Sequence, residues 1–111
     1  MPLVHLSLAL TMLAAGDKPL PAYDAALNCA GVTQAASRFG EGPETAKAFD
    51  SAMYWSLAAM EAARANGLSA SAAQADQDRA RDAYKALLED DDADAWADLA
   101  GCLKATPPTS G

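Results

Sequence analysis

The chain has 111 residues, of which 15 are acidic and 8 are basic, and its formal net charge at pH 7 is −7. An acidic surface disfavours binding to the phosphate backbone of nucleic acids and to an anionic membrane. The length indicates one domain with a modest core.

The N-terminal segment carries an apolar run over residues 3–15. The run is shorter than the roughly 20 residues that a membrane-spanning helix needs, and it has the length of a signal-peptide core. Small residues follow at Ala14, Ala15 and Gly16, although no Lys or Arg precedes the run. We therefore predict a signal peptide over residues 1–16. The alternative is an N-terminal helix that packs on the core of a cytosolic protein.

The first predicted helix runs from about Ala22 to Phe39. The chain is rich in alanine, the best helix former, and it contains no isoleucine, so the composition favours an all-α fold. Apolar residues at helical spacing predict one buried face on this segment. The face consists of Ala25, Cys29, Val32, Ala36 and Phe39.

The second predicted helix follows Gly42, which suits the N-cap, and it stops at Asn66-Gly67. It is apolar around most of its circumference, which is typical of a central helix. One stripe holds Phe49, Met53, Leu57 and Met60, and Trp55 lies on the opposite side. Core packing is the preferred role of this stripe, and truncation of Met53 or Leu57 to alanine should then cost about 2–4 kcal/mol. The alternative is a ligand or partner face formed by Phe49, Met53, Trp55, Leu57 and Met60.

The third predicted helix begins at Ser69 or Ser71, and Ser71–Gln74 fits a capping box. Its first half is highly polar, which predicts a peripheral, solvated helix. Substitutions at Gln77 or Asp78 should therefore change stability by no more than about 0.5 kcal/mol.

The fourth predicted helix begins near Asp92 or Asp94 and carries Trp96, Leu99, Cys102 and Leu103 on one side. Together the four segments predict a compact four-helix bundle of short helices whose sequential neighbours are antiparallel. The helical domain should span residues 17–105, and a disordered tail should follow over 106–111.

The two cysteines, Cys29 and Cys102, lie on the apolar faces of the first and last predicted helices. In an oxidising compartment the simplest interpretation is a disulfide that joins these two helices. The alternative is a pair of separately buried thiols. A redox-active pair is disfavoured because the chain has no Cys-x-x-Cys motif.

Several kinds of chemistry lack their residues. The only histidine is His5, inside the predicted signal peptide, so the mature chain has no histidine to activate a nucleophile or bind a metal. No phosphate-binding loop is present. Asp50 and Glu61 are eleven positions apart on one helix, roughly 16 Å, which is too far to flank one bond. We interpret these two carboxylates as partners of Lys47, Arg64 or a tyrosine hydroxyl at the edge of the core. We predict no catalytic residue and no cofactor.

The acidic run at residues 89–94 suggests calcium at first sight. On the EF-hand template from Asp90, however, Ala95 stands where the turn glycine belongs and Gly101 stands where the bidentate glutamate belongs. The preferred interpretation is capping of the fourth helix, and no metal site is predicted. Weak binding of a divalent cation is the alternative.

The segments Tyr23–Ala30 and Met53–Met60 resemble small exported helical proteins of alphaproteobacteria. That group has no assigned activity, so the resemblance implies export and a helical fold only. In size, helix content and its two cysteines, the chain is also similar to periplasmic acid-stress chaperones of the HdeA type, although no motif carries this similarity.

These observations predict a periplasmic or secreted protein that is not an enzyme and acts by binding an unknown partner protein. It would act as a chaperone, an inhibitor or a stress component. One alternative is a small-ligand carrier with an apolar cavity along the second helix. The other is a small enzyme that uses Asp50, Tyr54 or Glu61.

Overall fold

The computed structural model describes residues 22–39 and 43–108, which form four helices and confirm the all-α prediction. The predicted signal peptide over residues 1–16 lies outside the described residues. No helix in the described part of the chain is long and apolar enough to cross a membrane. The four helices are α2 (Tyr23–Ala36), α3 (Pro43–Ala65), α4 (Ala70–Glu89) and α5 (Ala93–Ala105).

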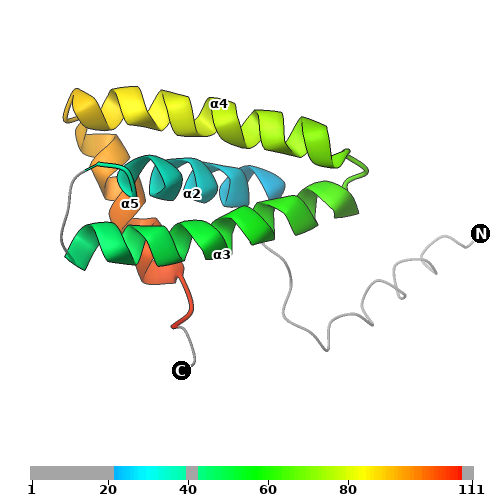
Figure 1. Ribbon diagram of the computed structural model, residues 1–111, viewed down its shortest axis with the longest axis horizontal. Coiled ribbons are helices and arrows are strands. Elements are labelled where there is room, and N and C mark those ends of the chain that lie inside the picture. Colours follow the sequence, from blue (N-terminus) through cyan, green and yellow to red (C-terminus); the bar gives the residue numbers. More distant parts are fainter. Residues whose placement is uncertain (1–21, 40–42, 109–111) are drawn as a thin grey trace, which may run out of the picture.

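The helices form a bundle in which α2 lies between α3 and α4 (Figure 1). Helix α3 runs antiparallel to both of them, as predicted for sequential neighbours, whereas α5 crosses the other three helices at one end. The predicted antiparallel pairing of the last two helices is therefore wrong. The three-residue connection from Asp90 to Asp92 contains Asp91 at φ 57°, and the chain changes direction sharply at this left-handed residue.

Helix α2, and not α3, is the central helix of the bundle. Its buried residues lie on both sides because two long helices pack against it, and most of them are small: Ala26, Ala30, Gly31, Val32, Thr33, Ala35 and Ala36. The predicted buried face is partly wrong. Ala25 is exposed and its neighbour Ala26 is fully buried, and Phe39 is exposed and lies beyond the end of α2 at Ala36. Small side chains allow helix backbones to approach closely, and this approach decides which helix occupies the centre.

Gly31 marks the closest approach between α2 and α4. A Cβ atom at this position would lie 2.7 Å from the Cβ of Ala80 and 2.9 Å from its carbonyl carbon. We expect Gly31→Ala to lower the free energy of unfolding by about 1–3 kcal/mol, because backbone atoms of α4 must move. Urea denaturation followed by circular dichroism measures this change.

The matched control for this prediction is Gly101→Ala in α5. An added Cβ at Gly101 meets no atom within 4 Å. The same substitution there should raise stability by up to about 1 kcal/mol, through helix propensity alone. Equal effects at the two glycines would contradict the close packing of α2 on α4.

Local signals fix the helix ends. The Ser69 hydroxyl accepts a hydrogen bond from the Ala72 amide at 3.1 Å, so Ser69 is the N-cap of α4. The predicted capping box at Ser71–Gln74 is wrong, because Ser71 already lies inside the helix. At the end of α3, Gly67 has φ 80° and the Leu68 amide donates to the Ala63 carbonyl at 2.9 Å. This is the predicted left-handed stop, in the Schellman form.

A buried polar network ties α4 to the centre of the bundle. Gln77 is only 2% exposed. The Gln34 amide donates hydrogen bonds to Gln77 Oε1 and to Ser56 Oγ, both at 2.8 Å. The prediction that α4 is solvated through its first half is therefore wrong at Gln77, because its polar side chain finds partners on α2 and α3.

Gln77→Ala is expected to lower the free energy of unfolding by about 1–3 kcal/mol, because the Gln34 side-chain amide loses one of its two acceptors and the Ser56 carbonyl loses a donor. The matched control is Gln74→Ala, one turn earlier on the exposed side of α4, which should change stability by no more than about 0.5 kcal/mol. Thermal denaturation of both variants measures the difference. Equal melting temperatures would place Gln77 outside the core.

Two tyrosine–aspartate hydrogen bonds also hold α4. The Tyr23 hydroxyl donates to Asp76 at 2.7 Å, and the Tyr84 hydroxyl donates to Asp98 at 2.8 Å. Burial, followed by the hydrogen bond to the carboxylate, raises the pKa of Tyr23 and the pKa of Tyr84 to about 12.

A raised tyrosine pKa in the folded state stabilises the protein below pH 10, and this contribution is lost as the pH rises through about 12. We expect the urea midpoint to fall between pH 10 and pH 12, and to fall less in the Tyr23→Phe/Tyr84→Phe double variant. Denaturation curves at pH 8, 10 and 11 test this. Parallel pH dependence in the two proteins would refute it.

The Cys29–Cys102 disulfide joins α2 to α5, and the two Cα atoms are 5.5 Å apart. The predicted bridge between the first and last helices is therefore confirmed. Cys29 packs against both hydrophobic clusters of the core, one around Val32, Leu88 and Leu99 and the other around Trp55. A disulfide at this position indicates folding in an oxidising compartment.

Candidate functional site

Helix α3 buries small side chains and exposes large ones. Its core-facing residues include Ala48, Ala52, Ala59 and Ala62, with Trp55 as the one large exception. On the opposite side, Phe49 is 57%, Met53 is 56% and Leu57 is 66% exposed. We call these three residues the α3 stripe. The preferred sequence interpretation, that the stripe packs in the core, is wrong, because alanines are what fit against α2.

The α3 stripe lines one wall of an open groove of about 490 Å³ between α3 and the C-terminal end of α2. The facing wall is polar and contains Gln34, Ser37 and Arg38. Arg38 forms no ion pair with any carboxylate whose side chain the structure describes. The wall of the groove on α3 is therefore apolar, and the facing wall carries one cationic side chain, Arg38.

The structure separates the five residues of the predicted ligand or partner face. Phe49, Met53 and Leu57 lie together in the groove, whereas Met60 lines a smaller hollow between α3 and α4. Trp55 is 7% exposed and points into the core. The spacing i, i+4 and i+8 shows from the sequence that Phe49, Met53 and Leu57 share one side of the helix. It does not show whether that side is buried or exposed.

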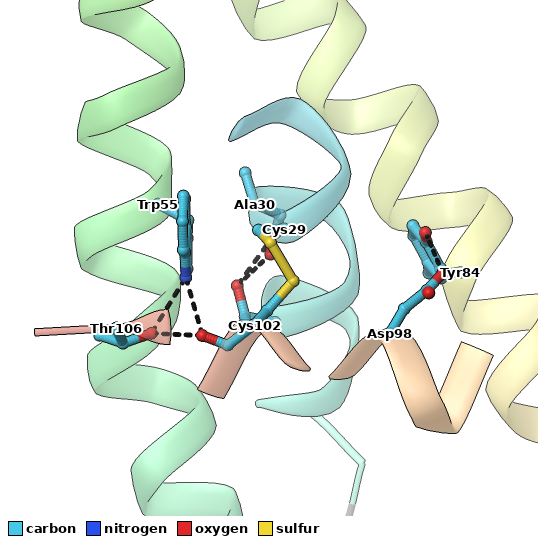
Figure 2. Close-up of a disulfide and its surroundings, with 8 residues drawn as sticks. Cys29, Ala30, Trp55, Tyr84, Asp98, Cys102 and Thr106 are labelled. Carbon is cyan, nitrogen blue, oxygen red and sulfur yellow. Dashed lines mark hydrogen bonds between the residues drawn. A yellow bond between two sulfur atoms is a disulfide. The ribbon is translucent and has the colours of Figure 1, made fainter. Parts of the chain in front are cut away.

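Trp55 holds the C-terminal end of α5 (Figure 2). Its indole N–H donates to the Cys102 carbonyl at 3.2 Å and to Thr106 Oγ1 at 3.0 Å. The Thr106 hydroxyl itself donates to the Cys102 carbonyl at 2.7 Å. Thr106, which the sequence assigns to the tail, is thus bonded to the core beside the disulfide.

The carboxylates considered for catalysis do not share a site. Glu61 forms an exposed ion pair with Arg64, which is one of the partners that the sequence suggests. Asp50 and Tyr54 lie instead in a second hollow, between α3 and the end of α5. Asp50 and Glu61 line different hollows, so these two carboxylates do not flank one substrate bond.

Within the acidic run, Asp92 is the N-cap of α5, and its Oδ2 accepts a hydrogen bond from the Ala95 amide at 3.0 Å. The capping interpretation is confirmed. Among residues 22–39 and 43–108, no group of three or more His, Cys, Asp or Glu side chains is placed to hold a metal ion.

The second hollow was not found by sequence reasoning. It has a volume of about 840 Å³, and it places Lys47 and Tyr54 of α3 beside Lys104 of α5. These residues are far apart in sequence and share no motif, so only the crossing of α5 over α3 brings them together.

The α3 stripe and the second hollow are surface features of the described residues that helix packing does not explain. Comparisons of the chain with protein-family models, with curated proteins and with solved structures find no match. What the protein does must therefore follow from its own residues.

Proposed function

We propose that this protein is a periplasmic or secreted binding protein, not an enzyme, and that the α3 stripe is its contact surface for a partner protein. The observation that carries the proposal is the exposure of three large apolar side chains on the side of α3 that faces away from the core. Such residues contribute little to folding where they are, and contiguous apolar surface is typical of interaction sites.

The partner is an amphipathic helix that lays its apolar side along the groove. A docked helix presents apolar side chains about one turn apart along its length, and Phe49, Met53 and Leu57 are likewise spaced about one turn apart along α3. Full burial of such side chains is worth about 1.5–3 kcal/mol each. Association costs offset much of this gain, so the complex is expected to be of moderate affinity.

The charge of the chain favours a basic partner helix. The net charge is −7, and helical register puts Asp50 along one edge of the α3 stripe, whereas Glu61 on the same edge is paired with Arg64. Attraction to this edge would orient the partner helix and accelerate its association. Binding should therefore weaken as the salt concentration rises.

The geometry favours this role over the two alternatives. A carrier of small ligands buries most of its ligand in an enclosed pocket, whereas the side chains of the α3 stripe are each more than half exposed. An enzyme based on carboxylates needs Asp50 and Glu61 near one another, and they line different hollows. Chaperone, inhibitor and stress-component roles all agree with a helix-binding groove.

Site-specific photocrosslinking in the native host tests the proposal. A photoreactive residue at position 57 should capture a basic partner in the exported fraction, and the same residue at the exposed position Ala75 on α4 should not. Met53→Asp in the position-57 protein should abolish the adduct without changing the circular dichroism spectrum. Identical adducts from positions 57 and 75 would refute the contact surface. Export is tested separately, by N-terminal sequencing of this chain purified from the native host. The sequence should begin near Gly16 or Asp17, and a retained Met1 in cytosolic protein would refute export.

A further inference from the structure

The hollow between α3 and α5 is lined by positively charged residues from both helices. Lys47 lies in the N-terminal half of α3, and Lys104 lies in the last turn of α5. Asp50 is the one acidic residue of the lining. In a chain with a net charge of −7, a hollow with two lysines and one carboxylate is a local reversal of charge.

The two lysines also differ from most other cations of the protein. Arg64, Arg79, Arg81 and Lys85 each form an ion pair with a nearby carboxylate. Neither Lys47 nor Lys104 pairs with a carboxylate whose side chain the structure describes. Among the described residues, no carboxylate therefore forms an ion pair with Lys47 or Lys104 that an anion entering the hollow would have to displace.

Apart from the two lysines and from Asp50, Ser51 and Thr106, the residues of the lining are apolar or aromatic, and they are held in place from behind. Leu103, Pro107 and Pro108 form one side. On the other side, Tyr54 packs edge-on against Trp55, with ring centroids 4.9 Å apart. The hydrogen bonds from Trp55 to Thr106 and to Cys102 fix the two sides relative to each other, beside the disulfide. The hollow is thus preorganised, which lowers the cost of binding a ligand.

We propose that this hollow binds a small organic anion with one carboxylate or sulfonate group and an apolar body. The anionic group would lie between the ammonium groups of Lys47 and Lys104, and the apolar body would pack on Leu103, Pro107 and the ring of Tyr54. Asp50 disfavours ligands with a second negative charge. This site is separate from the α3 stripe and does not depend on the proposed partner.

Fluorescence titration with 1-anilinonaphthalene-8-sulfonate tests the site, because this probe carries one sulfonate on an aromatic body. Lys47→Gln and Lys104→Gln should each raise its Kd about tenfold or more. Lys85→Gln on α4 makes the same change of charge elsewhere and should leave the Kd unchanged. Octanoate should displace the probe at concentrations where octanol, its uncharged counterpart, does not.

The α3 stripe provides the second control. Leu57→Asp should leave the Kd of the probe unchanged if the probe binds in the hollow between α3 and α5. Loss of binding in Leu57→Asp, with Lys47→Gln and Lys104→Gln unaffected, would place the probe on the stripe and overturn the proposal. Equal loss in Lys85→Gln, or equal displacement by octanol and octanoate, would show that the two lysines do not select the anion and would overturn it as well.

Discussion

Reduction of the Cys29–Cys102 disulfide is expected to lower the free energy of unfolding by about 4 kcal/mol, the chain-entropy value for a loop of this length. The bond closes 73 residue positions and joins the first described helix to the last. A helical core built mainly from alanine contributes little hydrophobic stabilisation for each residue. Loss of about 4 kcal/mol is comparable with the whole stability of a small domain.

Urea denaturation with and without reductant measures this effect. The Cys29→Ala/Cys102→Ala double variant should be at most as stable as the reduced protein, because it also lacks the buried sulfur atoms, and reductant should not change its midpoint. These two proteins separate the loss of the covalent bond from the loss of packing at Cys102, which is 7% exposed. An oxidised protein no more stable than the reduced one would contradict a stabilising bridge.

Trp55→Ala is the substitution with the next largest expected effect, a loss of about 3–5 kcal/mol. The indole is the only large side chain in a cluster otherwise formed by Ala26, Ala30, Ala58 and Ala59, with Cys29 beside it. Its removal leaves a cavity that alanines cannot fill. It also removes the donor that holds Thr106 and the Cys102 carbonyl.

Two further variants identify the cause of this loss. Trp55→Phe keeps most of the volume and removes the N–H donor, so its loss should be smaller, about 1 kcal/mol from the hydrogen bond plus a packing contribution. Leu57→Ala, on the opposite side of the same helix, should change stability by no more than about 0.5 kcal/mol. Chemical denaturation followed by circular dichroism gives all three values. A larger loss for Leu57→Ala than for Trp55→Ala would reverse the assignment of the two sides of α3.

The end of α3 and the starts of α4 and α5 could be predicted from the sequence because their signals are local, whereas α2 ends at Ala36, three residues before the predicted Phe39. Ser69 and Asp92 cap helices through their own side chains, and Gly67 stops α3 through its backbone conformation. The disulfide follows from two cysteines on apolar faces of distant helices. These signals need no knowledge of how the helices pack against one another.

The buried side of α3 could not be predicted, because both of its sides are apolar. Hydrophobicity ranks Met53 and Leu57 above alanine, so it assigns the larger residues to the core. The packing instead depends on close approach at Gly31 and the neighbouring alanines of α2, and a single sequence does not show which small residues meet. The burial of Gln77 was missed for the same reason, since its partners lie on two other helices. The hollow with Lys47 and Lys104 exists only because α5 crosses α3.

The two sides of α3 divide the requirements of folding and recognition between different residues. The alanines that pack on α2 leave almost no freedom for change, whereas Phe49, Met53 and Leu57 can be replaced without disturbing that contact. Most mutations that create new binding properties also reduce stability, and this cost limits how far a surface can change. On α3 that coupling is weak, so the same scaffold could acquire a different partner by a few substitutions on the exposed side alone.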